Sequence, residues 1–141
     1  MKNLLIIVFL CCSYVSFSQA SSDEQVKKTL QNYIDGSSYN KLKLLRSAFS
    51  KNATLYLTTR DGFKRLTPED YVGFFKNSKE GEFNGRHGKI LSVEVTKDIA
   101  TARVEISIPK RKWIFIDLFL LKKTGEGWKI ISKTATRIDN E

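Results

Sequence analysis

The stretch Lys112–Lys122 reads KWIFIDLFLLK and is apolar except for its two ends and one carboxylate, Asp117. Successive side chains of a β-strand point to opposite faces. We therefore predict a central strand in a sheet covered on both sides. An unpaired buried carboxylate is costly, so Asp117 either lines a pocket or accepts a structural hydrogen bond. The face that carries Asp117 also carries Trp113, Phe115, Phe119 and Leu121.

Residues 1–20 have the pattern of a bacterial secretory signal peptide. Lys2 precedes an apolar run at residues 4–10, and small residues stand at Ser18 and Ala20. The run is short for a membrane span. We predict cleavage after Ala20 and a periplasmic or extracellular location. The alternatives are a retained N-terminal anchor and a lipoprotein modified at Cys11.

We predict that residues 21–141 form one domain without disulfides, because both cysteines, Cys11 and Cys12, lie in the N-terminal segment. The formal charge of the full chain is +9, from 24 basic and 15 acidic residues. Such a charge attracts anionic partners. The basic residues are scattered and accompany no nucleic-acid-binding motif, so we expect no nucleic-acid partner. We also expect no stable membrane span once the signal segment is removed.

The first half of the domain is predicted to be mainly helical. Ser22 or Asp23 is the predicted cap of a first helix that runs to about residue 35, with apolar residues at helical spacing. A short helix spans about residues 40–49. A strand at 52–58 and an Asp-Gly turn suggest a hairpin. Thr67-Pro68 followed by two acids starts a third helix, ending by Ser78, that buries Tyr71, Phe74 and Phe75.

The second half is predicted to be β. After a polar loop at 79–88, strands cover residues 89–97, 100–108, the Lys112–Lys122 stretch and 128–138. In the strand at 100–108 the odd positions are mostly polar and the even positions apolar, which indicates one exposed face. Helices followed by antiparallel strands joined by tight turns define an α+β fold.

This order resembles the NTF2-like superfamily, which is named for nuclear transport factor 2, and the related SnoaL-like proteins. The chain is most similar to the bacterial branch known as putative lumazine-binding. The resemblance extends from about residue 24 to 138, and it rests on packing and turn residues, which indicate fold more than chemistry. The motifs that carry it are LRSAF (45–49), ATL (53–55), GKILSV (88–93), ATARVE (100–105), DLFLLK (117–122) and GWKII (127–131).

The resemblance implies a cone, in which a curved antiparallel sheet wraps around the N-terminal helices and leaves a pocket at the open end. It also implies a homodimer, because relatives commonly pair through the outer face of the sheet. Thr101, Arg103, Glu105 and Ser107 are the polar candidates for that face or for solvent.

Asp117 and His87 are the candidate catalytic residues. Asp117 in an apolar pocket would be a general acid or base, because burial raises the pKa of a carboxyl group. Alternatively, it is held by a tyrosine, tryptophan or backbone group and positions the strand. His87 is the only histidine and precedes a strand. It either pairs with Asp117 at the mouth of the cone or is an exposed loop residue.

Aromatic residues are the candidate ligand contacts. Three tyrosines could donate hydrogen bonds to a ligand or belong to the core with their hydroxyls at its rim. Ketosteroid-isomerase-like sites also use a second, protonated carboxylic acid, and this chain has no such residue in an apolar stretch. The candidate ligand-binding residues are Tyr33, Tyr56, Tyr71, Phe75, Trp113, Phe115 and Phe119.

We expect no cofactor and no metal site, since one histidine and no mature cysteine leave only unclustered carboxylates. Three functions remain open. The first is a pocket that binds a small apolar or aromatic molecule without catalysis. The second is an enzyme of the isomerase, dehydratase or hydrolase type that uses Asp117. The third is a dimeric interaction module that acts through its sheet face.

Overall fold

The computed structural model describes residues 20–138. The predicted signal peptide and its cleavage site therefore lie almost wholly outside the described residues. Within residues 20–138, no helix is both long enough and apolar enough to cross a membrane.

Two helices open the described chain. Helix α1 (Ser22–Ser38) begins with a capping box, in which the Ser21 hydroxyl accepts a hydrogen bond from the Glu24 backbone and the Glu24 carboxylate accepts one from the Ser21 backbone. Its buried face includes Val26 and Leu30, as the helical spacing predicts. Helix α2 (Leu42–Ala48) packs against α1.

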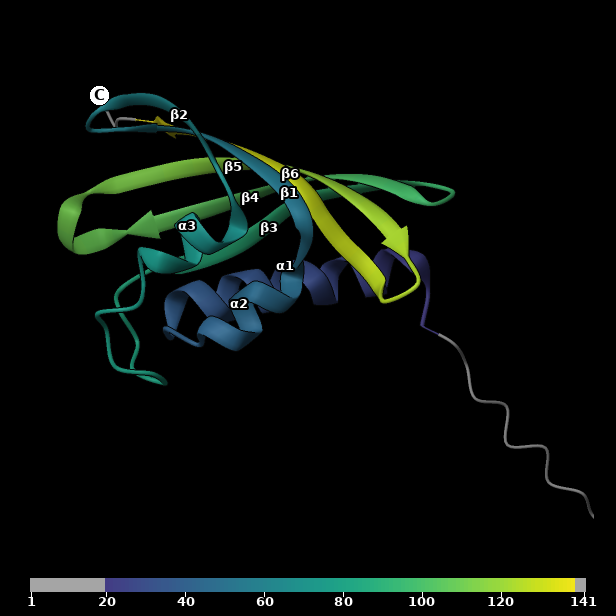
Figure 1. The fold of residues 1–141 in the computed structure, drawn as a ribbon, viewed down its shortest axis with the longest axis horizontal. Helices are drawn as coiled ribbons and strands as arrows, with labels where there is room; N and C mark the ends of the chain where they lie inside the picture. The colour runs from purple at the N-terminus through teal and green to yellow at the C-terminus, as the bar shows by residue number, and fades with distance from the viewer. Residues whose placement is uncertain (1–19, 139–141) are drawn as a thin grey trace, which may run out of the picture.

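The strands form one curved six-stranded sheet, with the helices on one side of it (Figure 1). The strand order is β2-β1-β6-β5-β4-β3. A third short helix, α3 (Pro68–Gly73), follows β2, and a 3-10 turn (Pro109–Arg111) joins β4 to β5. The strands are β1 (Phe49–Thr59), β2 (Gly62–Leu66), β3 (His87–Thr96), β4 (Ile99–Ile108), β5 (Trp113–Thr124) and β6 (Gly127–Ile138).

The sheet is mixed, which corrects the prediction of a purely antiparallel sheet. Strands β1 and β6 pair in parallel, while the other neighbouring strands are antiparallel. Tight turns dictate antiparallel pairing only between strands that follow each other in sequence. Strands β1 and β6 are far apart in sequence, so no hairpin sets their relative direction.

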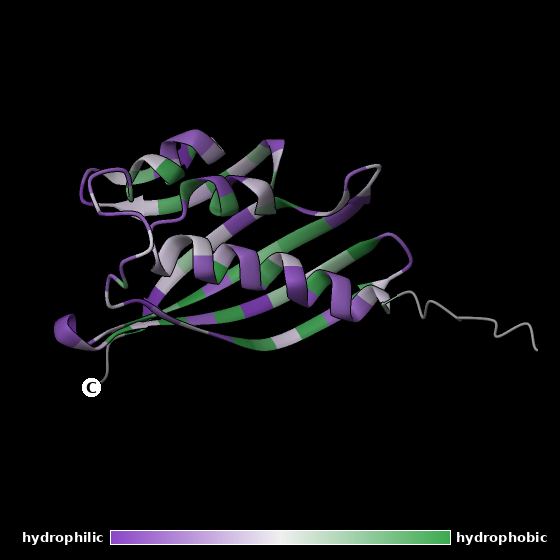
Figure 2. Ribbon diagram, turned by 90° about the horizontal axis from the view of Figure 1, so that it is seen from below, coloured by the Kyte–Doolittle hydropathy of each residue, from purple (hydrophilic) through white to green (hydrophobic). Residues whose placement is uncertain are grey.

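The two faces of β5 differ sharply. Asp117, Phe119 and Leu121 are buried against the helices, whereas Leu118 and Leu120 are 45% and 49% exposed. Hydrophobic and hydrophilic residues alternate along the strands beneath the helices (Figure 2). The prediction of a strand covered on both faces is therefore wrong for the single chain, since its apolar outer face is open.

Helix α3 is shorter than expected and ends at Gly73. Tyr71 and Phe75 are buried as predicted, but Phe74 is 59% exposed. The chain continues after Gly73 in turns rather than in a helix, so Phe74 points away from the core that Tyr71 enters.

Candidate ligand pocket

A hydrogen-bonded chain of two tyrosines and one carboxylate lies at the inner face of the sheet. The Tyr33 hydroxyl, from α1, donates to Oδ2 of Asp117 at 2.6 Å. The hydroxyls of Tyr33 and Tyr71 are 2.7 Å apart. A phenol has a single hydrogen to donate. Because Tyr33 gives its hydrogen to Asp117, Tyr71 must be the donor to Tyr33.

This arrangement holds Tyr33 in its neutral form. Burial raises the pKa of the Tyr33 hydroxyl well above its ordinary value, and the negative charge of Asp117 raises it further. Tyr33 therefore remains a hydrogen-bond donor throughout the physiological pH range. Its ring also packs edge-on against Phe119, with centroids 5.0 Å apart, which fixes the direction of the hydroxyl.

Lys133 of β6 forms a buried ion pair with the carboxylate of Asp117. Its Nζ is 3.0 Å from Oδ1 of Asp117, and both side chains are almost fully buried. The ammonium also lies over the rings of Tyr33, Tyr71 and Phe119, at 5.4 to 5.8 Å from their centroids. Both oxygens of Asp117 are thus occupied, one by Tyr33 and the other by Lys133.

Arg86 is a second cation near this carboxylate. It stands immediately before β3 and lies within electrostatic range of Tyr71, Tyr33 and Asp117. Its guanidinium carbon is 5.4 Å from the centroid of the Phe75 ring. The Nε atom is buried, and no described residue accepts its hydrogen. An N–H of a charged group left in this state is unusual in a folded protein.

These residues stand at the inner end of a pocket of about 660 Å3. Ligand pockets in proteins commonly have volumes of this order. Its walls combine aromatic side chains with cations from several elements. The lining residues are Leu57, Thr58, Thr59, Arg60, Tyr71, Phe74, Arg86, Trp113, Phe115, Asp117, Lys133, Ala135, Thr136 and Arg137.

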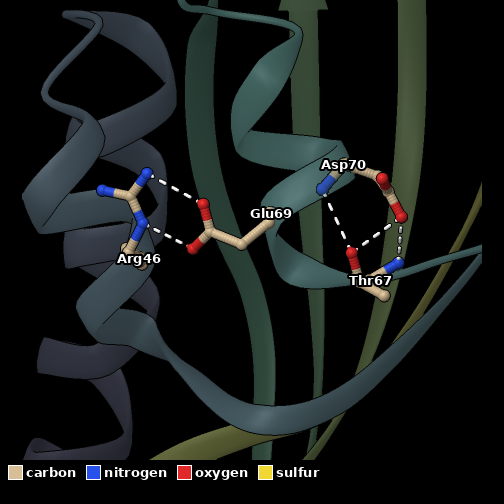
Figure 3. Close-up of polar contacts among 4 residues, drawn as sticks. All are labelled: Arg46, Thr67, Glu69 and Asp70. Atoms are coloured by element: carbon tan, nitrogen blue, oxygen red, sulfur yellow. Dashed lines mark hydrogen bonds and ion pairs between the residues drawn. The ribbon is translucent and has the colours of Figure 1, made fainter.

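Helix α3 brings Tyr71 to this pocket. Thr67 and Asp70 form a capping box at the start of the helix (Figure 3). Glu69 of the same turn accepts two hydrogen bonds from Arg46 of α2, at 2.5 and 3.0 Å. This bidentate pair ties α3 to α2, which keeps Tyr71 beside the hydroxyl of Tyr33.

The structure brings together most of the residues proposed from the sequence. Asp117, Tyr71, Trp113 and Phe115 line the pocket. Tyr33 is fully buried behind Asp117 and Tyr71. Phe119 and Phe75 belong to the hydrophobic core and support the pocket from beneath, so their direct contact with a ligand is not supported by their positions.

Two proposed residues lie elsewhere. Tyr56 is on the outer face of the sheet and is 40% exposed, because its neighbours Leu55 and Leu57 take the inward positions of β1. His87 is exposed at the start of β3 and packs edge-on against Phe83 at 4.8 Å. It is not among the residues that line the pocket, so its position supports the alternative of an exposed residue.

The sequence analysis missed Arg86 and Lys133. The inward position of Lys133 depends on a β-bulge in β6, which alternation along the sequence does not indicate. Leu121 pairs with Ile130 and Leu120 pairs with Ser132, so Ile131 is an extra residue in β6. Simple alternation from the inward Ile130 would place Lys133 outside. Arg86 sits in a polar, glycine-containing loop, where the sequence carries no signal that separates a pocket residue from a solvated one.

Within residues 20–138, no group of three or more histidine, cysteine, aspartate or glutamate side chains is placed to hold a metal ion. The pocket lining supplies aromatic surfaces, hydroxyls, cations and the carboxylate of Asp117.

Solved structures with the same architecture define the class of protein. The chain aligns with an NTF2-like protein of unknown function from Shewanella baltica OS155 with a TM-score of 0.70 and 20% identity, over 83% of this chain and 94% of the other. An NTF2-like protein of unknown function from Methylobacillus flagellatus KT aligns with a TM-score of 0.71 and 22% identity, over 86% and 96%. At these identities the likeness establishes an NTF2-like fold.

The family follows from the sequence match. Residues 21–135 match the model of the family described as "Putative lumazine-binding". The chain therefore belongs to this family, as the resemblance indicated, and its fold is NTF2-like. A search of the curated proteins found no match.

Proposed function

We propose that the protein binds a small organic molecule in its cone pocket without transforming it. The observation that carries this proposal is the pocket of about 660 Å3, walled by Trp113, Phe115 and Phe74 and backed by polar groups at one end. Apolar walls with a few convergent polar groups are typical of ligand sites. The family description, which names lumazine binding, supports a ligand of this size class.

Binding is favoured over catalysis by the state of Asp117. A general base must reach a proton on the substrate, but Asp117 already accepts from Tyr33 and pairs with Lys133. The enzyme hypothesis stays a prediction. It requires that Asp117→Asn abolish turnover of an identified substrate.

We also propose that the protein acts outside the cytoplasm of a bacterium. The support is the signal-peptide pattern of residues 1–20. The mass of the protein recovered from its own host tests this directly, because removal of residues 1–20 gives a chain that begins at Ser21.

Native mass spectrometry of the protein purified from its own host tests the binding proposal. A reproducible extra mass is the expected result. Ala135 lines the pocket and pairs with Asp117, so Ala135→Leu should fill the space and remove the extra mass. Thr134→Leu, one residue away on the outer face, is the matched control and should retain it.

The contradicting results are equally clear. An empty wild-type protein that also shows no thermal stabilisation by any member of a small-molecule library would count against ligand binding. An extra mass that survives in Ala135→Leu would place the ligand outside the cone.

A homodimer is the second proposal, and it concerns the opposite face of the sheet. Leu118, Leu120 and Tyr56 are exposed there and line a shallow groove of about 450 Å3. Exposed apolar surface of this kind marks an interaction site. Sedimentation velocity over a range of protein concentrations measures whether the chain self-associates.

A further inference from the structure

We propose that the ligand is an organic anion of the carboxylate class, bound with its charged group against Arg86 and its apolar part against Trp113 and Phe115. This inference rests on the proposed binding function and specifies the class of molecule bound. It comes from the charges of the pocket, which neither the family description nor the fold predicts.

The pocket is strongly cationic. Four of its lining residues are basic, namely Arg60, Arg86, Lys133 and Arg137, and Asp117 is the only acid among the described residues that line it. Four positive charges and one negative charge give a formal charge of +3. Aromatic walls exclude water and strengthen the resulting field. This field favours an anionic ligand over a neutral one.

The one carboxylate does not neutralise both inner cations. Asp117 is engaged by Lys133 at 3.0 Å and by the Tyr33 hydroxyl at 2.6 Å. Arg86 keeps a buried Nε hydrogen that no described residue accepts. The inner end of the pocket therefore holds a net positive charge, and the Arg86 guanidinium there has one N–H without an acceptor among the described residues.

A carboxylate matches this donor. The guanidinium group presents its N–H donors in a planar fork that fits the two oxygens of a carboxylate. Tyr71 also lines the pocket, but its hydroxyl hydrogen is given to Tyr33, so Arg86 supplies the donors for the carboxylate. An incoming anion would thus offset the positive charge at the inner end of the pocket and bring acceptors to the Arg86 guanidinium, which lines it.

Trp113 of the pocket lining has two guanidinium groups near its ring. The guanidinium carbons of Arg111 and Arg137 lie 4.8 Å and 5.5 Å from the ring centroid. These contacts hold the indole in place as an apolar wall, while the charges attract anions toward the opening.

The general basicity of the chain does not explain these charges. Surface lysines and arginines of a chain with a formal charge of +9 are solvated. Lys133, in contrast, is 2% exposed, and the Nε atom of Arg86 is buried. Burying cations is costly, which indicates that these two are retained for a purpose at this site.

Matched ligand pairs test the inference. Benzoate and 2-naphthoate are compared with benzamide and 2-naphthamide, which have the same rings and no charge. The protein is used as its host processes it, and each compound is titrated into it. Binding is measured by isothermal titration calorimetry and by ligand-observed NMR. We expect the acids to bind at least about tenfold more tightly than the amides at low ionic strength, and the difference to shrink at high salt.

Two arginine variants locate the effect. Arg86→Gln should reduce the preference for the acids to about twofold or less, since it removes the charge that the carboxylate contacts. Arg65→Gln makes the same change at an exposed position of β2 that lines neither the pocket nor the outer groove, and it should leave the preference intact. Arg86→Lys keeps the positive charge but loses the planar pair of guanidinium donors, so we expect an intermediate preference for the acids. This variant replaces Arg86→Gln in the test if Arg86→Gln does not fold.

Each contrary outcome overturns a defined step. Equal binding of acids and amides would overturn the anionic class and leave ligand binding standing. Binding of neither, to a wild-type protein whose fold is verified by circular dichroism, would overturn both proposals. An equal loss of preference in Arg86→Gln and Arg65→Gln would show a general charge effect and overturn the role of Arg86.

Discussion

Asp117 is the residue on which the site depends, and the structure explains why an acid stands in an apolar strand. Tyr33 and Lys133 occupy its two oxygens inside the core. The sequence predicted both a pocket position and a structural hydrogen bond as alternatives, and the geometry combines them. Asp117 anchors the inner end of the pocket and is held by a tyrosine.

Replacement of Asp117 should therefore destabilise the fold. Asp117→Leu leaves the Lys133 ammonium buried without its partner, which typically costs about 3–5 kcal/mol. The double variant Asp117→Leu/Lys133→Met removes both charges and should recover much of this loss. Urea denaturation measures the free energy of unfolding of the single and the double variant against wild type. A wild-type midpoint for Asp117→Leu alone would show that the pair contributes nothing to stability.

Tyr33 makes the stability of the protein sensitive to high pH. Its pKa is raised in the folded state, so above pH about 10 the unfolded chain releases this proton while the folded chain retains it. The stabilisation that Tyr33 provides is complete below that pH and is lost as the pH rises toward its folded pKa. Tyr33→Phe should cost about 1–3 kcal/mol at pH 7.

The pH profile separates this effect from a simple loss of packing. Denaturation of wild type and Tyr33→Phe at pH 7 and at pH 10.5–11 gives two differences in stability. We expect the difference to shrink at the higher pH. A difference that stays constant or grows would mean that the hydroxyl is not protected from ionisation.

At the scale of elements, the helices and the succession of strands along the chain were predictable because they depend on local chemistry. Thr67 caps α3 as predicted, whereas α1 is capped by Ser21, one residue before the earlier of the two predicted caps, Ser22. The inward residues of β4 follow simple alternation. The bulge at Ile131 and the parallel pairing of β1 with β6 were not predictable, since both depend on contacts with distant strands.

The packing of α1 on the sheet depends on a close approach at Gly88 of β3. A Cβ atom at Gly88 would lie 2.5 Å from a side-chain carbon of Ile34 on α1. Gly88→Ala must push the helix and strand apart, which should cost about 1–3 kcal/mol. Gly125→Ala is the matched control, because a Cβ there meets nothing within 4 Å. Thermal unfolding of the two variants compares them directly.

Equal stability of the two glycine variants would show that α1 can shift on the sheet without cost. In that case the position of Tyr33, which is carried by α1, would be less rigid than the hydrogen bond to Asp117 implies.

For the whole molecule, the sheet separates two surfaces of opposite character. The inner face gathers cations around a pocket, and the outer face exposes aliphatic residues. The sequence indicated the apolar outer residues through the alternation of β5, but not that they are uncovered. Coverage depends on whether another chain is present, which no pattern within one chain reveals. The proposed dimer would cover this open strand face with a second copy of the chain.

The dimer proposal leads to a prediction at a single residue of that face. Leu120 is 49% exposed on β5, near the middle of the sheet. Leu120→Glu would bury a carboxylate in an apolar interface, where an unpaired charge is strongly unfavourable. We expect a dimeric wild type and a monomeric variant in sedimentation velocity at equal concentration. The fold of the variant should be intact, because residue 120 faces away from the core.

Phe83→Glu provides the matched control. Phe83 is 46% exposed, a similar fraction to Leu120, but it lies in the loop before β3 rather than on the sheet. Its replacement changes the net charge by the same amount, so it should leave the dimer unchanged. Dissociation in both variants would point to charge rather than to the sheet face. A dimer that persists in Leu120→Glu would place the contact between copies elsewhere on the molecule.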